Sequence, residues 1–139
     1  MIYVLDASVA LKTVLREPDS LAALKLLDEY RRQIHELLAP DTFVVEVAHA
    51  LTRAERRNVI PPGEAANLLG EIMTMRPMLH SYLSLIPRAV ELSSQFKIGV
   101  YDCLYAALAE REGCELVTAD ERLVKALGQH FAIVSLSAL

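Results

Sequence analysis

Four acidic residues in this chain stand where side chains could work together. Asp6 and Asp120 each come just after a short apolar run, Asp102 lies in an almost wholly apolar segment, and Glu46 lies in a third segment. Carboxylates brought together repel one another unless cations lie between them. Such oxygen ligands suit Mg²⁺ or Mn²⁺, ions that activate a water and stabilise charge on a phosphate diester. The four acids therefore indicate metal-dependent phosphodiester hydrolysis.

Each acid also has a simpler explanation when it is taken singly. Asp6 and Asp120 could be ordinary turn or helix-cap residues, and Asp102 could face the helix dipole. Glu46 could belong to a solvated helix face. Each strand-end aspartate has a hydroxyl two positions away, Ser8 or Thr118. Four unrelated helix caps or surface charges are therefore a poor explanation of the four acids taken together.

The segment from Gly99 to Glu112 predicts the central helix of the fold. Tyr101, Leu104, Tyr105 and Leu108 recur at helical spacing, and alanines fill most of the other positions. A helix that is apolar on nearly all sides is buried. We therefore expect Asp102 to be a carboxylate in the first turn of a buried helix, where it needs a partner.

The remaining elements predict an α/β fold. Short apolar runs indicate strands, and amphipathic segments between them indicate helices; one begins at Ser20, with Leu21, Leu24 and Leu27 expected to face inward. Alternation of this kind is typical of parallel strands in a layered sheet, where ligands bind beyond the carboxyl ends of the strands. The predicted strands are Ile2 to Leu5, Ile34 to Ala39, Glu115 to Thr118 and Ala132 to Leu136; the predicted helices include Gly63 to Arg76, Ser84 to Lys97 with Val90 inward, and Glu121 to Gly128.

Composition narrows the class of protein. The 139 residues fit one domain, residues 1–139. The net charge of −4 argues against a general nucleic-acid coat, and the 53% apolar content hints at a surface covered by a partner. Two cysteines outside any metal or disulfide pattern favour a reduced, cytoplasmic setting, and neither a signal peptide nor a membrane span is expected.

Four motifs in this order resemble the PIN-domain family, and within it the VapC-type toxins of toxin–antitoxin pairs. They are DAS near the start, VVEV, VYDCLYAALA and LVTADERL. The resemblance implies a three-layer α/β/α fold with a short central parallel sheet, and endoribonuclease activity with Mg²⁺ or Mn²⁺. It also implies frequent homodimers and a small antitoxin that covers the site. The residues that it implies are the acids Asp6, Glu46, Asp102 and Asp120 and the supporting hydroxyls of Ser8 and Thr118.

Two questions stay open at this point. Lys12, Arg16 and Arg53 are candidates for RNA contact, although each could be a plain surface charge. The chain could also be a nuclease for RNA maturation or DNA flaps without an antitoxin, or a non-catalytic binding module of the same fold. Intact acids at all four positions argue against the last alternative.

Overall fold

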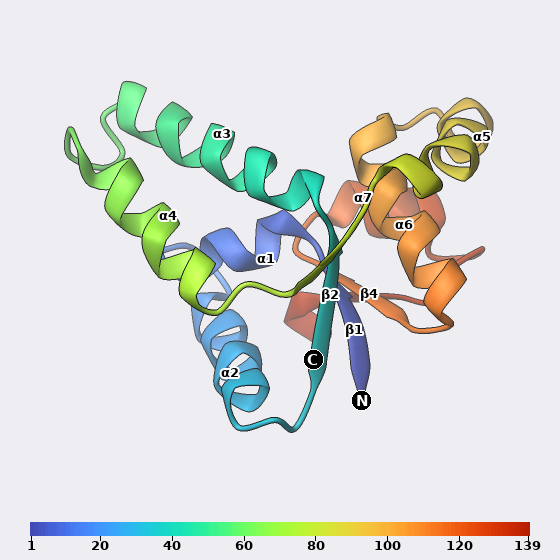
Figure 1. Ribbon diagram of the computed structural model, residues 1–139, viewed down its shortest axis with the longest axis horizontal. Coiled ribbons are helices and arrows are strands. Elements are labelled where there is room, and N and C mark those ends of the chain that lie inside the picture. Colours follow the sequence, from blue (N-terminus) through green and yellow to red (C-terminus); the bar gives the residue numbers. More distant parts are fainter.

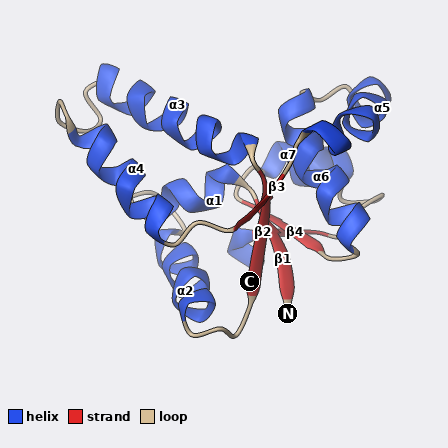
Figure 2. Ribbon diagram, in the orientation of Figure 1, coloured by secondary structure: helices blue, strands red, loops and turns tan.

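A five-stranded parallel sheet forms the centre of the protein in this computed structural model, which describes residues 1–139. The strand order is β3-β2-β1-β4-β5, and every neighbouring pair is parallel. Figure 2 shows the strands in red between the blue helices. The predicted α/β class and the short parallel sheet are confirmed. The strands are β1 (Ile2–Leu5), β2 (Glu36–Pro40), β3 (Met78–His80), β4 (Glu115–Thr118) and β5 (Ile133–Ser135).

Helices cover both faces of this sheet, which gives the three layers. The first four helices lie on one side and the last three on the other (Figure 1). None of them is long and apolar enough to span a bilayer. The helices are α1 (Ala7–Lys12), α2 (Ser20–Arg31), α3 (Thr42–Arg56), α4 (Glu64–Thr74), α5 (Ile86–Phe96), α6 (Val100–Glu112) and α7 (Glu121–Leu127), with short 3-10 turns at Leu83–Leu85 and Leu136–Ala138.

Helix α6 is the buried helix that its composition predicts. Every residue from 103 to 109 is buried, because α5 packs along one side of the helix and β1, β2 and β4 cover another. The expectation that Tyr101 belongs to this core is wrong, since it is 60% exposed. Tyr101 lies in the first turn of α6, ahead of the stretch that the sheet and α5 cover, and this turn also carries Asp102.

The inward face of α2 is not the one that leucine spacing predicts. Leu21 is 84% exposed and Leu24 43% exposed, whereas Ala23 and Leu26 are buried. The small Ala23 side chain lets the helix backbone approach the core closely, so the buried face is centred on Ala23 and Leu26. Two leucines consequently remain on the surface of α2.

The third strand and the start of α5 also differ from expectation. Strand β3 was not predicted, because three residues are too short to show a strand period. The helix expected from Ser84 begins at Ile86, after a 3-10 turn. Val90 is 48% exposed, because α5 buries the neighbouring Ala89 and Leu92 instead.

Truncation of one leucine in α6 and one in α2 tests which faces of these two helices are buried. Leu108→Ala should lower the free energy of unfolding by about 2–5 kcal/mol, because Leu108 is fully buried in α6. Leu21→Ala, the same chemical change on the exposed face of α2, should change it by less than about 0.5 kcal/mol. Urea denaturation of both variants measures the difference, and equal losses would contradict the orientation of α2.

Candidate active site

The topology brings two predicted acids to neighbouring strand ends. Strands β1 and β4 pair in parallel, with Leu5 opposite Val117. The pairing continues one residue further, since the backbone N–H of Asp6 donates to the carbonyl of Val117 at 3.0 Å. Asp6 and Asp120 therefore lie at the same carboxyl edge of the sheet, where a layered parallel sheet binds its ligands.

Asp6 is a buried carboxylate held by two hydroxyl groups. Ser8 Oγ and Thr118 Oγ1 each donate to Asp6 Oδ2 at 2.7 Å. The same hydroxyl oxygens accept backbone N–H groups, Ser8 from Ala119 at 3.1 Å and Thr118 from Asp120 at 3.0 Å. Ser8 does not cap α1, because its hydroxyl is engaged between Asp6 and the loop after β4.

Glu46 reaches this edge from α3 and is tied to α6. The phenol of Tyr105 donates to Glu46 Oε2 at 2.6 Å, and Thr42 Oγ1 donates to the same oxygen at 3.4 Å. Burial raises the pKa of Tyr105, so its hydroxyl keeps the proton that it donates. Spacing along the sequence indicates Tyr105 only as an apolar core residue and gives no sign of this polar contact across the sheet edge.

Asp102 and Asp120 lie together on the wall of an open cavity of about 340 Å³. Asp120 Oδ1 accepts the backbone N–H of Arg122 at 2.9 Å, so Asp120 is also the N-cap of α7, as the simpler explanation supposed. The guanidinium of Arg122 lies 3.3 Å from the same carboxylate, and Lys97 also lines the cavity. Neither Arg122 nor Lys97 was singled out from the sequence.

The carboxylates influence one another electrostatically. Burial is the main reason that the pKa of Glu46 rises to about 7, and the charges of Asp6 and Asp102 add to it. Burial likewise raises the pKa of Asp102 to about 6, with Asp6 and Asp120 adding to the shift. The pKa of Asp6 is raised by burial and by Asp120, against the lowering effect of its two hydroxyl partners. The four acids therefore form one cluster.

The donor set of this cluster fits a hard divalent cation. All its ligands are carboxylate and hydroxyl oxygens, which favour Mg²⁺ or Mn²⁺, and no histidine or cysteine takes part. As the side chains stand, no three of the chain's His, Cys, Asp and Glu residues are close enough together to enclose an ion. Binding of such an ion by these carboxylates would therefore draw their side chains closer together, with waters completing the coordination.

The basic residues expected to contact RNA are spread apart. Lys12 is engaged, since its ammonium donates to the carbonyl of Pro18 at 2.8 Å and lies 4.0 Å from Glu17. Arg16 is exposed in the loop after α1, and Arg53 is exposed on α3 two turns beyond Glu46. The structure thus brings the four acids and two hydroxyls together, and none of the three bases lines the cavity beside them.

Comparison with known proteins places this geometry in a family. The family model described as "PIN domain" matches residues 3–127. The chain belongs to the PIN-domain family. This PIN domain is 36% identical over 95 residues to ribonuclease VapC3 of Pyrobaculum aerophilum, covering 67% of this chain and 72% of the relative.

Two further comparisons extend over nearly the whole chain. Ribonuclease VapC3 of Mycobacterium tuberculosis is 31% identical over 130 residues, which cover 94% of this chain and 90% of the relative. The structure of VapBC2 from Rickettsia felis, bound to a DNA fragment from its promoter, superimposes with a TM-score of 0.67 at 17% identity, covering 97% of this chain and 98% of the other. The recognised family and the three-layer fold are confirmed.

The raised pKa values predict how the metal-free protein responds to pH. Folded Glu46 keeps its proton up to about pH 7, whereas unfolded glutamate loses it near its usual value of 4.5. The folded state binds more protons in this window, so stability falls as pH rises through it. In EDTA the melting temperature should fall from about pH 5 to about pH 8, and Glu46→Gln should flatten that fall and melt several degrees higher at the upper end.

The matched control is Glu36→Gln, the same change at the exposed opposite end of the sheet. It should follow the wild-type profile. A Glu46→Gln protein that melts below the wild type at every pH would mean that Glu46 is a structural hydrogen-bond partner and not part of a repelling cluster.

Proposed function

We propose that this protein is a VapC-type ribonuclease, the toxin of a toxin–antitoxin pair, and that Asp6, Glu46, Asp102 and Asp120 form its active site. The observation that carries the proposal is the shared carboxyl edge of β1 and β4, where α3 and α6 each add one acid. Curated relatives at 31–36% identity are named ribonucleases. We also infer that residues 1–139 act as a single PIN-like domain, because one buried core joins all its layers.

Each side chain then has a definite role. Ser8 and Thr118 hold Asp6 so that its carboxylate keeps one orientation while buried. Asp6, Asp102 and Asp120 would hold Mg²⁺ or Mn²⁺, an ion that supplies an activated water and offsets phosphate charge. Glu46, oriented by Tyr105, would ligate a second ion or position the attacking water. We propose a cytoplasmic location, because Cys103 and Cys114 are free thiols that suit a reducing compartment.

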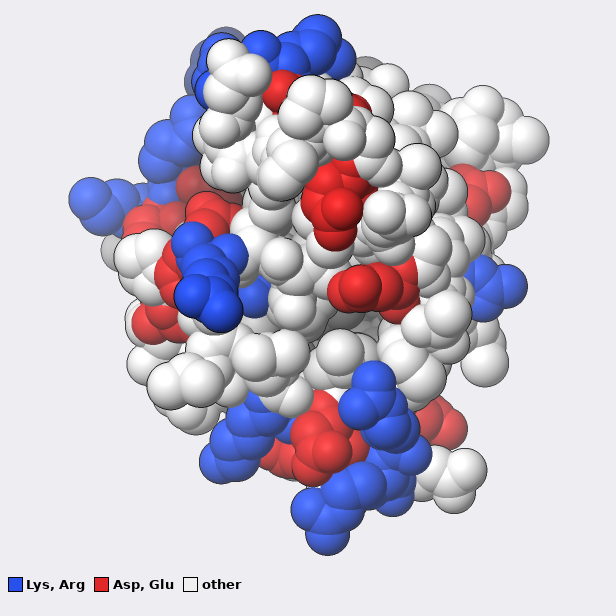
Figure 3. Space-filling model, turned by 90° about the vertical axis from the view of Figure 1, so that its left-hand side faces the viewer, with Lys and Arg blue, Asp and Glu red and all other residues white.

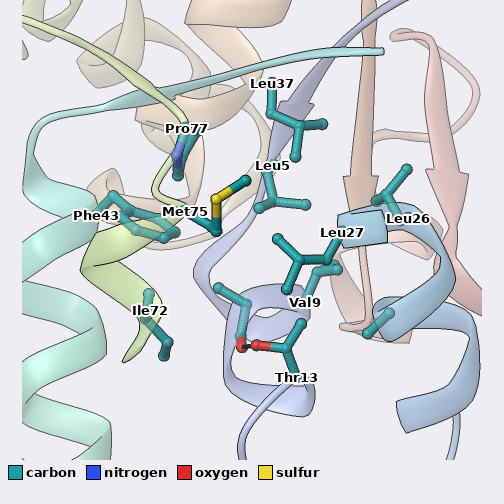
Figure 4. A pocket seen from close by; sticks show the side chains of 12 residues that line it. Leu5, Val9, Thr13, Leu26, Leu27, Leu37, Phe43, Ile72, Met75 and Pro77 are labelled. Carbon is teal, nitrogen blue, oxygen red and sulfur yellow. Dashed lines mark hydrogen bonds between the residues drawn. The ribbon is translucent and has the colours of Figure 1, made fainter. Parts of the chain in front are cut away.

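A groove beside the residues that follow α1 supports the proposed antitoxin partner. It has a volume of about 510 Å³ between α2 and α4, and Leu24, Leu27 and Met75 contribute apolar surface to it. Beneath it lies the small apolar pocket of Figure 4, lined by side chains such as Leu27, Phe43 and Met75. The face of the molecule seen in Figure 3 has a largely uncharged middle broken by separate acidic side chains, with basic side chains gathered at the top, along the left edge and at the bottom.

We propose that an antitoxin segment lays apolar side chains along this groove. Its basic side chain would extend to the carboxylate cluster and replace the charge of the cation. Structural neighbours of the chain include VapBC2 and the structure described as a toxin–antitoxin complex from Klebsiella pneumoniae. We further propose a homodimer, since Leu83, Val90 and Tyr101 leave apolar surface exposed around α5 and α6.

Purified protein should cut RNA internally with Mg²⁺ or Mn²⁺ and stop in EDTA. Asp102→Asn should lower the cleavage rate by about a hundredfold or more, because it removes one charge from the cluster, while circular dichroism stays native. Asp28→Asn, the same change in an exposed residue of α2, should cleave at the wild-type rate. Full activity in Asp102→Asn would remove Asp102 from the site.

Expression in growing cells tests the toxin role separately. The wild type produced without a partner should slow growth, and Asp6→Ala should not, because the variant loses the buried carboxylate that the hydroxyls position. Equal growth of the two strains, together with RNA cleavage in vitro, would favour a maintenance nuclease without an antitoxin. Immunoblotting at matched induction checks that both proteins accumulate.

A further inference from the structure

Two basic residues border the carboxylate cluster on the side of α5 and α7. Lys97 ends α5 and Arg122 lies in the first turn of α7, and both line the 340 Å³ cavity that contains Asp102 and Asp120. The chain as a whole carries a net charge of −4, and the cluster itself is acidic. An RNA backbone that approaches this cavity therefore needs local positive charge.

The guanidinium of Arg122 is only loosely engaged. Its side chain is 91% exposed, and its Nε and Nη2 atoms lie 3.4 and 3.3 Å from the Asp120 carboxylate. Well-formed charged hydrogen bonds are shorter, about 2.7–2.9 Å, and exposed ion pairs contribute little to stability. Asp120 already receives the backbone N–H of Arg122 at 2.9 Å, so the cap of α7 does not need the guanidinium.

Lys97 is free of ion pairs altogether. Its backbone N–H closes the last turn of α5, and no carboxylate lies within ion-pair distance of its ammonium. Its backbone is left-handed, with φ of 59°, a conformation that suits glycine or asparagine better than lysine. A charge at this position is therefore available to a ligand in the cavity, and asparagine can replace lysine without disturbing the helix end.

We propose that Lys97 and Arg122 form a phosphate-binding subsite that holds the RNA backbone next to the carboxylate cluster, an inference that rests on the proposed ribonuclease function. Arg122 pairs with Asp120 while the cavity is empty and turns to a backbone phosphate when RNA enters. A guanidinium can bind two phosphate oxygens at once, and the lysine adds a mobile point charge beside it. Both residues are substrate-binding groups and take no part in proton transfer.

Binding of RNA without turnover measures this subsite. The probe is a single-stranded RNA oligonucleotide, titrated by fluorescence anisotropy across a range of salt concentrations in Ca²⁺, a larger cation that binds oxygen ligands but activates water poorly. Arg122→Gln and Lys97→Asn should each weaken binding and reduce the slope of log K against log salt by about 0.7, the value for one lost phosphate contact on a single strand. Arg122→Lys should keep the slope and bind more weakly, because it loses the two-oxygen contact.

The matched control is Arg32→Gln, which removes an exposed arginine paired with Asp28 at the end of α2. It should leave both affinity and slope unchanged. A second readout is Mn²⁺ alone: Arg122→Gln should bind it at least as tightly as the wild type, because a competing cation has left Asp120. A purely structural arginine would instead lower Mn²⁺ affinity or thermal stability and leave the RNA slope unaltered.

The outcomes separate this inference from the proposed function. Wild-type cleavage of RNA combined with unchanged RNA binding in Arg122→Gln and Lys97→Asn overturns the subsite alone. A wild type that neither binds the oligonucleotide nor cuts RNA in Mn²⁺ overturns the ribonuclease function and the subsite with it. A slope lowered by about 0.7 in Arg32→Gln as well would also overturn the subsite, because RNA would then contact basic residues all over the surface.

Discussion

The burial of the Asp6 carboxylate is the constraint on which the site depends. A buried charge is costly unless polar partners surround it, and here the partners are hydroxyls on two different elements, Ser8 of α1 and Thr118 of β4. Both hydroxyls also bind backbone N–H groups of the loop that leads to Asp120. One carboxylate thus fixes the end of β1, the end of β4 and the start of α7 relative to one another.

The two helices that complete the cluster are linked across the edge of the sheet. Tyr105 of α6 donates to Glu46 of α3, so helices from opposite layers meet through one hydrogen bond at the site. Burial and like charge oppose ionisation of these acids, which makes the empty site a place where the fold gives up stability. Proteins commonly accept such a cost at functional sites, and a cation that binds the folded state offsets it.

The sequence allowed prediction of the elements that are buried on all sides and of the acids at their ends. Apolar runs in the sequence indicate strands β1 and β4 and helix α6. Because β1 and β4 pair in parallel, the residues that follow them, Asp6 and Asp120, lie at the same edge of the sheet. The half-buried elements were harder, because several faces of α2 are apolar and only packing selects Ala23 and Leu26. Contacts between distant segments, such as Tyr105 with Glu46, leave no periodic trace. Nothing in the sequence indicates that Arg122 pairs with Asp120, because residues two positions apart in the chain need not face each other.

The pairing of Arg122 with Asp120 bears on both proposed ligands of the site, RNA and an antitoxin. The guanidinium of Arg122 already lies beside one carboxylate of the cluster, that of Asp120, so this side of the cavity has room for a planar cation. A phosphate that draws Arg122 away leaves Asp120 free for a metal ion, so RNA and cation would favour each other's binding. A basic antitoxin side chain would have the opposite effect. It would pair with the carboxylates itself, so that neither a metal ion nor Arg122 could bind them. Under the proposed function, competition for one small set of negative oxygens would account for both cleavage of RNA and its inhibition by an antitoxin.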